Sequence, residues 1–516
     1  MKYVTSRLEN PIAFGCALIA CLIVGGSAGM DINWDLRNYH FYAGYAFFED
    51  RRDADLMPSQ LQSWFNPAGV LPAYLIIQTF PAYLAHLVFA ALSAVSVYVV
   101  YRLARACQTD AAGGLGIILA ALAGFGALWS PMFINQVGAT MNDGLTSLPV
   151  LGALLVLVAG RWTTASMAIA GALIGLAVGL KLTNAMFAAA IAFGCLTTAP
   201  GRDIRKLALM VGVAVLVFIP VGGLWIWSVW REFGNPLFPS LNNIFESPAY
   251  DPRRMLDRRF VPEDLRDALT LPLQWALQIR STAEIAARDG RFLIMGVLAL
   301  LTAPVMIARG QSTAAGYIFR PDATRFLAVF IAVSLVWWVN QYGIQRYIVA
   351  LEQIAILLIF ILIDRLTPER PGKALASVLF ATLIFVTMNA PNWGRAPHNP
   401  NWLEADFPAP EPSGGALYVM ITGHPMAYVI PSAADADRFV RIDGNMPLVN
   451  DNGLRREAAR RIETHIGPVR TLGPTEPDAQ HLALLGSFGL ERLPDACLPV
   501  TSTFETLQAC PLGRRP

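Results

Sequence analysis

Apolar segments about as long as a membrane-spanning helix recur through most of this 516-residue chain. About 20 apolar residues are long enough to cross the hydrocarbon core of a bilayer as a helix, and helices extend past the strictly apolar portion of a run. The runs are Pro11–Gly25, Pro81–Val100, Gly113–Leu128, Leu145–Ala159, Ala165–Leu180, Ala185–Thr197, Leu207–Trp227, Phe292–Ala308, Leu327–Val339, Ile348–Ile363 and Ala374–Thr387. They predict an α-helical polytopic membrane protein with about eleven transmembrane helices.

The charge content agrees with lipid as the main solvent of this chain. Only 15% of the residues are charged and the mean hydropathy is +0.46, whereas soluble domains carry about 25% charged residues. The formal net charge of +2 provides no global basic field, which argues against a nucleic-acid partner.

Lysine and arginine in the short loops set the predicted orientation. The first apolar run has small residues at its end, as a signal peptide does, but we favour an uncleaved anchor because many more spans follow. Basic residues fall before this run and then in every second loop. This pattern places the N-terminus in the cytoplasm. It places the first loop 31–67, the long loop 229–290 and the C-terminal region outside.

The composition changes after the last apolar run. Residues 391–412 form a proline-rich linker, and residues 413–516 are expected to form a small α/β domain outside the membrane. Cys497 and Cys510 are close enough in sequence to form a disulfide in an oxidising compartment. The expected elements of this domain are strands at Ala416–Ile421, Met426–Ile430, Val469–Leu472 and Leu507–Pro511 and an amphipathic helix at Leu454–His465. The remaining residues, 1–390, form the predicted transmembrane domain.

Polar residues crowd the first outer loop. On a helix that begins near Asp35, Tyr39 lies on about the same face as the carboxylate, and His40 turns to a neighbouring side. Asp31 stands four positions earlier. A purely structural explanation is that Asp35 caps a helix at the membrane surface and that the aromatic residues form an interfacial belt.

Three further polar clusters are predicted on the same side of the membrane. Asp143 follows Asn142 at the start of the fourth apolar run, where capping of a helix is the alternative explanation. Lys181 ends a run of glycines spaced four apart, which lets a neighbouring helix approach closely. Arg346 precedes the tenth run, and Glu352 is expected to pair either with Arg346 or with a neighbouring span.

Such clusters on one side point to chemistry at a single external cavity. A carboxylate can serve as a general base toward a hydroxyl, and an ammonium and a guanidinium can neutralise a phosphate leaving group. Ionisable groups at the membrane edge commonly mark a substrate path, although a lysine there can also reach lipid head groups.

The order and sidedness of these motifs resemble the bacterial GT-C glycosyltransferases. These are relatives of the dolichyl-phosphate-mannose-protein mannosyltransferases and the aminoarabinose transferases, which use polyprenyl-phosphate sugars. The matching motifs are Asp35-x-x-x-Tyr39-His40, Asn142-Asp143, Lys181-Leu-Thr183, Gly234-Asn-Pro-x-x-Pro239, Ile244-Phe245-x-Ser247-Pro248 and Arg346-Tyr347. The resemblance covers roughly residues 10–390, and the superfamily often carries a periplasmic appendage.

The resemblance implies roles for particular residues. Asp35 matches the catalytic aspartate of the first loop, the general base toward the acceptor. Asp143 matches the second acidic residue, which orients the acceptor or, in metal-using members, helps to hold a divalent cation. Lys181 and Arg346 would face the donor phosphate. The paired acidic residues of some relatives are absent, and Asp31 therefore stays an alternative to Asp35.

The resemblance also implies that Tyr39, His40 and Tyr347 line the sugar pocket. The predicted function is transfer of a sugar from a polyprenyl-phosphate donor to a lipid, glycan or protein acceptor, with inversion, at the periplasmic face of a bacterial inner membrane. The alternatives are a transporter or flippase of a lipid-linked saccharide, which should show inverted repeats, and a non-catalytic envelope assembly protein.

Overall fold

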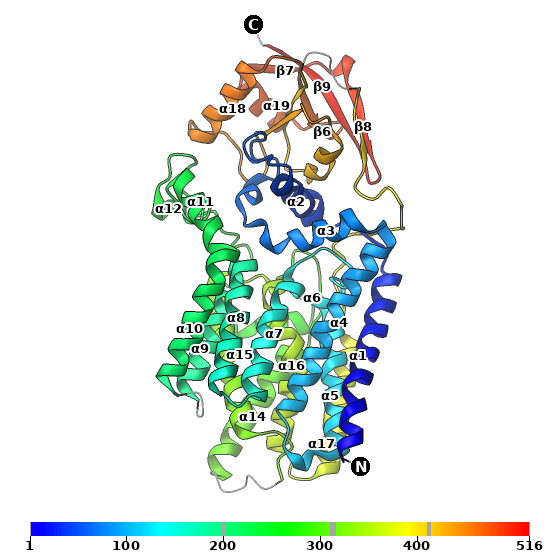
Figure 1. The fold of residues 1–516 in the computed structure, drawn as a ribbon, viewed down its shortest axis with the longest axis vertical. Coiled ribbons are helices and arrows are strands. Elements are labelled where there is room, and N and C mark those ends of the chain that lie inside the picture. The colour runs from blue at the N-terminus through cyan, green and yellow to red at the C-terminus, as the bar shows by residue number, and fades with distance from the viewer. Residues whose placement is uncertain (1, 199–201, 310–315, 410–413, 515–516) are drawn as a thin grey trace. The chain divides into compact units, whose positions relative to one another are not determined.

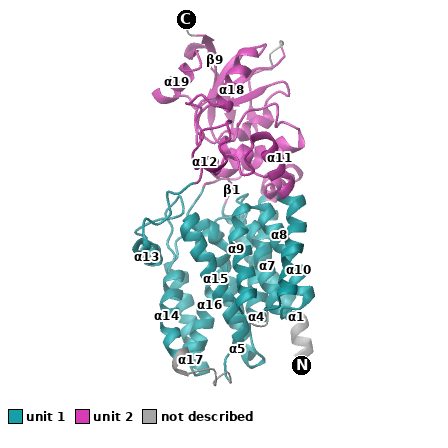
Figure 2. Ribbon diagram, turned by 90° about the vertical axis from the view of Figure 1, so that its left-hand side faces the viewer, with its two compact units in different colours: residues 1–28, 86–222, 257–393 teal, residues 29–85, 223–256, 394–516 magenta. Residues whose placement is uncertain are grey.

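The computed structural model describes residues 2–198, 202–309, 316–409 and 414–514 (Figure 1). The last three residues of the predicted linker, 410–412, lie outside this part of the chain. Two compact units make up the structure, each from three stretches of sequence (Figure 2). Unit 1 comprises residues 1–28, 86–222 and 257–393, and unit 2 comprises residues 29–85, 223–256 and 394–516. Unit 2 thus groups the first loop and part of the long loop with the C-terminal residues.

Unit 1 is a bundle of helices. The helices that lie wholly or mainly in it are α1 (Lys2–Ser27), α4 (Ala82–Ala106), α5 (Gly113–Leu128), α6 (Pro131–Ile134), α7 (Asp143–Ala159), α8 (Thr164–Leu180), α9 (Ala185–Thr197), α10 (Ile204–Phe218), α13 (Leu265–Ala276), α14 (Arg291–Arg309), α15 (Pro321–Gln341), α16 (Val349–Leu366) and α17 (Arg370–Thr387). Short 3-10 helices η4 (Asp110–Ala112), η5 (Leu182–Asn184) and η7 (Gln345–Ile348) and the π-helix η6 (Ile219–Gly223) complete it. Ten of the eleven predicted apolar runs each coincide with one of the longer helices, and the run Leu207–Trp227 covers α10, η6 and the start of α11 (Leu224–Phe233).

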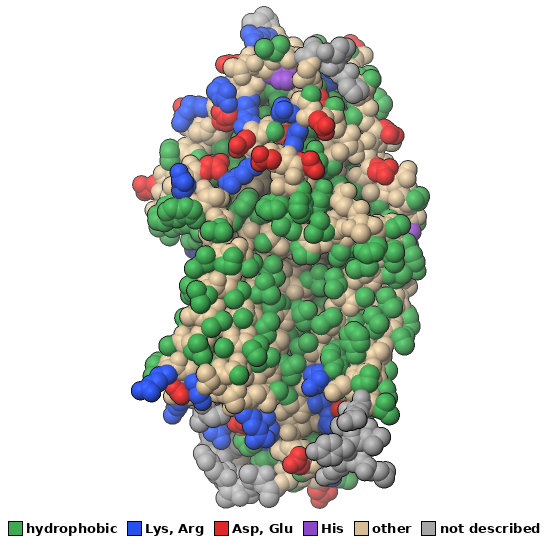
Figure 3. All heavy atoms as spheres, in the orientation of Figure 1, with side chains coloured by type: hydrophobic (Ala, Val, Ile, Leu, Met, Phe, Trp, Pro, Cys, Tyr) green, Lys and Arg blue, Asp and Glu red, His purple; other side chains and the backbone are tan. Residues whose placement is uncertain are grey.

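Hydrophobic side chains cover the visible face of these helices in Figure 3. Among the described residues, seven helical segments are long and apolar enough to cross a membrane, and four shorter helices are also apolar. Helix α16 is buried among the others almost throughout, and the residues between Gln353 and Asp364 are all apolar. The structure therefore supports a multi-pass membrane protein, while the predicted count of about eleven spans remains a prediction.

The spaced glycines bring α8 against α10, as predicted from the sequence. A Cβ atom added to Gly171 would lie 2.3 Å from the Met210 carbonyl oxygen, and one on Gly175 would lie 2.2 Å from that of Ala214. Only glycine permits two helix backbones to approach so closely. This contact runs along α8 toward its C-terminal end, where Lys181 follows.

Unit 2 contains short helices and a seven-stranded mixed sheet. Its helical elements are η1 (Leu36–His40), α2 (Phe41–Phe48), η2 (Gln60–Trp64), η3 (Pro67–Gly69), α3 (Leu71–Thr79), α11 (Leu224–Phe233), α12 (Asn242–Phe245), η8 (Ala427–Ser432), α18 (Gly453–Thr464), α19 (Ala479–Gly486) and η9 (Pro494–Ala496). Its strands are β1 (Met30–Asp31), β2 (Arg395–Ala396), β3 (Ala405–Asp406), β4 (Leu417–Met420), β5 (Arg438–Arg441), β6 (Val469–Gly473), β7 (Leu490–Arg492), β8 (Leu498–Ser502) and β9 (Thr506–Arg514).

The sheet follows the order β3-β8-β9-β6-β4-β5, with β7 also pairing with β9. Strand β4 runs parallel to β5 and β6, while β9 runs antiparallel to β6, β7 and β8. The antiparallel pair β1–β2 places Asp31 opposite Arg395. The predicted small α/β fold is confirmed, and the linker supplies β3 at one edge of the sheet.

Most of the elements predicted after the linker are present, with one exception. Strands β4, β6 and β9 and helix α18 occur where they were expected, and Cys497 and Cys510 form the predicted disulfide. The strand predicted at Met426–Ile430 is wrong, because this segment forms the 3-10 helix η8. Pro425 and Pro431 flank it, and proline cannot donate to a strand ladder, so the β-branched residues between them do not extend into the sheet.

Candidate active site

Three of the predicted site residues meet at one end of unit 1. Asp143 begins α7, Lys181 follows the last residue of α8, and Arg346 lies in η7 before α16. The Lys181 ammonium donates to Asp143 Oδ1 at 2.5 Å and to Asn142 Oδ1 at 3.0 Å. The Arg346 guanidinium forms an ion pair with Asp143 Oδ2 at 3.5 Å. Two cations that are far apart in the sequence therefore share one carboxylate.

Tyr347 completes this cluster as an aromatic neighbour of both cations. The Lys181 ammonium lies 5.4 Å from the centre of its ring, and the Arg346 guanidinium carbon lies 5.7 Å from it. A cation over an aromatic ring at such distances is attracted by the ring quadrupole. We call Asn142, Asp143, Lys181, Arg346 and Tyr347 the cation cluster.

Local backbone features fix the cation cluster in place. Asn184, in the turn after α8, donates to the carbonyl oxygens of Thr146 on α7 and Ala177 on α8, both at 3.0 Å. It ties the end of α8 to the start of α7, which sets Lys181 beside Asp143. Gly343 has a φ of +67°, and a side chain there would collide with the Phe260 backbone, so glycine is required in the turn that leads to Arg346.

Burial makes the electrostatics of this cluster strong. The Asp143 side chain is 3% exposed, whereas those of Lys181 and Arg346 are 18% and 14% exposed. Asp143 Oδ2 accepts no hydrogen bond from the described residues, and 3.5 Å from Arg346 is longer than a good hydrogen bond. A buried carboxylate oxygen in this state is suited to accept a hydrogen bond from a substrate hydroxyl.

Asp143 is the first residue of α7, where the helix dipole favours a negative charge, but it is not the N-cap residue. Asn142 is the N-cap residue of α7 and makes no side-chain capping hydrogen bond, and the Asp143 carboxylate pairs with the two cations instead. These contacts do not fit a divalent cation on Asp143, since Lys181 and Arg346 would repel it. Among the residues that the structure describes, no group of three or more His, Cys, Asp or Glu is placed to hold a metal.

Two neighbours of the cluster have roles that the sequence left open or did not reveal. Glu284 accepts from Arg346 Nε at 3.1 Å, and nothing in the pattern of the long loop distinguishes this residue. Glu352 accepts from the Met132 backbone N–H at 3.0 Å and from Gln345 Nε2 at 3.3 Å. It therefore joins α16 to the short elements α6 and η7, and neither of these partners belongs to a neighbouring span as predicted.

The other four predicted residues lie in the first loop, in unit 2. The predicted helix near Asp35 exists, but it starts with the π-helix η1 before continuing as α2. Asp35 is its N-cap residue, 8% exposed, and makes no side-chain capping hydrogen bond. The Tyr39 ring packs edge-on against His40 at 4.4 Å between centroids, and His40 is 1% exposed. A π-helix within an α-helix is common at functional sites.

Asp31 has a structural environment of its own. Its carboxylate accepts from the Asn33 side-chain amide at 2.7 and 2.8 Å and from the Asn33 backbone N–H at 3.1 Å. The Asp31 carbonyl oxygen accepts from Trp402 Nε1 at 2.9 Å. Burial lowers the pKa of the paired Arg395 guanidinium, and the charge of Asp31 opposes this shift. These bonds hold β1 in place at the entrance to the loop.

The asparagines of the long loop are also structural. Asn242 donates to the carbonyl oxygens of Ser247, Tyr250 and Asp251, and Asn235 donates to Ser240 and Asn242. The motif that resembles the GT-C family here thus shapes the loop. Sequence alone does not separate such a role from ligand binding, because both call for buried amides.

The comparisons with known proteins agree with this architecture. Residues 64–317, just under half of the chain, match the family model of Glycosyltransferase family 87. The fold resembles that of ArnT from Cupriavidus metallidurans bound to undecaprenyl phosphate, with 13% identity, a TM-score of 0.56 and coverage of 98% of both chains. The chain is a multi-pass membrane protein with the GT-C glycosyltransferase fold. The resemblance inferred from short motifs is thereby confirmed for the fold.

Two further structures were similar to different degrees. The apo state of the same ArnT matches with 12% identity and a TM-score of 0.53 over 98% of both chains. The apo oligosaccharyltransferase from Archaeoglobus fulgidus matches over 90% of this chain and 70% of its own, with 13% identity and a TM-score of 0.44. No curated protein sequence matches the chain.

Proposed function

We propose that this protein is a glycosyltransferase that moves one sugar from a polyprenyl-phosphate donor to an acceptor hydroxyl. The GT-C fold and the match to Glycosyltransferase family 87 support the reaction class. The ArnT structure of the same fold was determined with undecaprenyl phosphate bound, which supports the lipid-phosphate carrier. The acceptor is a lipid, a glycan or a protein at the periplasmic face of a bacterial inner membrane.

The cation cluster is the observation that carries this proposal. Breaking the bond between the sugar and the phosphate leaves a negative charge on the phosphate, and cations positioned before the reaction stabilise that charge. Lys181 and Arg346 are 18% and 14% exposed, so a phosphate can reach them, and their shared carboxylate holds them in a fixed position. A guanidinium also matches phosphate geometry with two parallel hydrogen bonds.

The proposed reaction is a single displacement at the anomeric carbon. The acceptor oxygen forms a bond to this carbon as the bond from the carbon to the phosphate oxygen breaks, and the configuration inverts. The electron pair of the broken bond stays on the polyprenyl phosphate, where Lys181 and Arg346 neutralise it. Asp35 takes the proton of the acceptor hydroxyl as the general base, and Asp143 orients a substrate hydroxyl through its Oδ2. Tyr347 would line the sugar pocket from the cation cluster.

The local structure supports Asp35 over Asp31 as the base. Three hydrogen bonds from Asn33 hold the Asp31 carboxylate in place beside β1. Asp35 directly precedes η1, which carries the proposed sugar-contacting residues Tyr39 and His40.

The test is the loss of transfer in an Asp35→Asn variant that still folds. We expect transfer from a radiolabelled polyprenyl-phosphate sugar in proteoliposomes to fall at least about a hundredfold, as for removal of a general base. Asp50→Asn is the matched control, because Asp50 is exposed in the same unit and its φ of +49° suits asparagine. Comparison of envelope glycans from cells with and without the gene identifies the product.

Two results would contradict this proposal. Full activity of Asp35→Asn protein would exclude this residue as the base. Movement of an intact lipid-linked saccharide across the bilayer, without a new glycosidic bond, would instead identify a flippase.

A further inference from the structure

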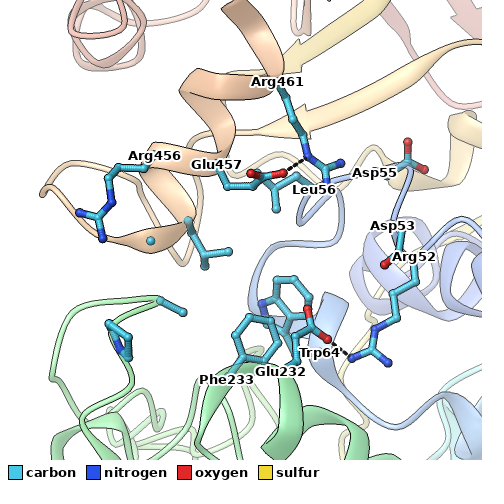
Figure 4. Close-up of a pocket in the computed structure, with 14 residues that line it drawn as sticks. Arg52, Asp53, Asp55, Leu56, Trp64, Glu232, Phe233, Arg456, Glu457 and Arg461 are labelled. Carbon is cyan, nitrogen blue, oxygen red and sulfur yellow. Dashed lines mark hydrogen bonds and ion pairs between the residues drawn. The ribbon is translucent and has the colours of Figure 1, made fainter. Parts of the chain in front are cut away.

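A pocket lies in unit 2, between the first loop, the end of α11 and helix α18 (Figure 4). Its volume is about 380 Å³, within the range of pockets that bind small molecules. None of the predicted site residues lines it. The pocket is built from three stretches that are far apart in sequence but belong to the same unit.

Two aromatic rings give the pocket an apolar side. Trp64 from η2 and Phe233 from α11 are 7% and 9% exposed, and their ring centres are 4.8 Å apart at an interplanar angle of 69°. Both rings belong to the hydrophobic core of unit 2, which fixes their orientation. Leu454 at the start of α18 adds an aliphatic contact. A rigid aromatic surface of this kind suits the C–H face of a sugar ring.

Ion pairs give the pocket its polar sides. Arg52 pairs with Glu232 at 2.5 Å, and Arg461 pairs with Glu457 at 2.7 Å, both drawn in Figure 4. Their side chains are between 21% and 44% exposed, so each pair presents N–H donors and carboxylate acceptors to a ligand. Alternating donors and acceptors are what the hydroxyl groups of a saccharide require.

The charge balance of the lining disfavours an anionic ligand. Three arginines line the pocket together with four carboxylates, namely Asp53, Asp55, Glu232 and Glu457. Asp55 is itself paired with Arg51 at 2.9 Å. A pocket without excess positive charge does not attract a phosphate, but it can bind a neutral polyol.

Trp64 contacts the pocket with its ring and not with its N–H group. Trp64 Nε1 is buried and makes no hydrogen bond among the described residues. Because this atom has almost no accessible surface, a ligand in the pocket does not reach it, and the ring is the contact surface that Trp64 provides.

We propose that this pocket binds a neutral saccharide unit, one or two sugars in size, of the acceptor glycan. The sugar ring packs on Trp64 and Phe233, and its hydroxyls bond to the two ion pairs. The binding itself is independent of the chemistry at the cation cluster. The identification of the saccharide as part of the acceptor rests on the proposed function.

Saturation-transfer NMR on the full-length protein in nanodiscs tests this binding. The probes are the methyl glycosides of D-glucose, D-galactose, D-mannose, L-rhamnose and D-arabinose. Disaccharides built from D-glucose, D-galactose or D-mannose are also used. We expect at least one probe to bind with a Kd tighter than about 10 mM. Trp64→Phe reduces the aromatic surface on which the sugar ring packs, and it should weaken binding about three- to tenfold.

Two further variants make the test specific. Ala249 lines the pocket, and Ala249→Trp should fill it and abolish binding. The matched control is Trp275→Phe, because Trp275 in unit 1 is also buried with its Nε1 unpartnered among the described residues. This control should bind the probes as the wild type does. The thermal midpoint of every variant is measured in the same nanodiscs.

The inference is overturned if none of the probes binds the wild-type protein. It is also overturned if folded Trp64→Phe and Ala249→Trp proteins bind the probes as well as the control does, or if inorganic phosphate competes with them. These readouts need no donor and no transfer. Loss of binding therefore refutes the pocket alone, whereas full transfer by Asp35→Asn protein refutes the proposed base alone.

Discussion

Replacing Lys181 by methionine removes one of the two cations proposed to neutralise the donor phosphate. Methionine is similar in length, and it readily adopts the extended backbone that Lys181 has after α8. The change removes the 2.5 Å ion pair with Asp143 and the 3.0 Å hydrogen bond to Asn142. It therefore affects both the stability of the fold and the proposed chemistry.

The expected loss of stability follows from the burial of Asp143. A carboxylate that is 3% exposed loses its short partner and retains Arg346 at 3.5 Å. Removing one member of a fully buried ion pair costs about 3–5 kcal/mol, and the 18% exposure of Lys181 places this case lower, at about 2 kcal/mol. The thermal midpoint in detergent should fall accordingly.

The double variant Lys181→Met/Asp143→Asn separates stability from chemistry. It leaves no unpaired buried charge, so its free energy of unfolding should return to within about 1 kcal/mol of the wild type. Its transfer activity in proteoliposomes should stay about a hundred- to a thousandfold below the wild type, the cost of losing one electrostatic donor at a reacting centre.

One result refutes this reasoning. If the double variant transfers sugar at the wild-type rate, Lys181 serves only to neutralise Asp143 and does not contact the donor phosphate.

Three further perturbations test the fold that positions the site. Gly175→Val should place a side chain against an α10 carbonyl and destabilise the bundle by about 3 kcal/mol, measured as a lower thermal midpoint. Cys510→Ser opens the loop of 13 residues closed by the Cys497 disulfide, which should cost about 3 kcal/mol in unit 2 and increase its proteolysis. Burial raises the pKa of Glu505, but its hydrogen bond to His424 and further partners leave it lowered overall. The charged Glu505 carboxylate therefore stabilises the fold at neutral pH, and this stabilisation is lost as the pH falls below about 4. The stability of Glu505→Gln protein should depend less on pH over this acid range.

The sequence predicted well those features that depend on local pattern. Each apolar run became a helix because length and composition alone decide whether a segment is stable in lipid. The glycine spacing before Lys181 predicted the close approach of two helices, since a missing side chain has a direct geometric consequence. The helix expected near Asp35 is present, but the sequence did not predict that it includes the π-helix η1.

The contacts between distant residues were harder to predict. The sequence placed Asp143, Lys181 and Arg346 on one side, but it did not show that both cations bind one carboxylate, because this depends on how α7, α8 and α16 pack. It gave no signal for Glu284, which lies in an irregular segment and contacts Arg346 only through tertiary structure. The pocket beside Trp64 was missed for the same reason, since three separate stretches build it.

A comparison with Arg291 shows that a cation must be exposed, as well as charged, to contact a substrate. This arginine begins α14 and lies in the same unit as Lys181 and Arg346. It is 0% exposed, pairs with Asp289 at 2.8 Å, and donates to the carbonyl oxygens of Gly126, Trp129 and Glu352. A guanidinium bonded in this way joins helices and leaves no path for a substrate. Lys181 and Arg346 differ in remaining partly exposed while held by a shared carboxylate, which is the condition that binding a lipid phosphate demands.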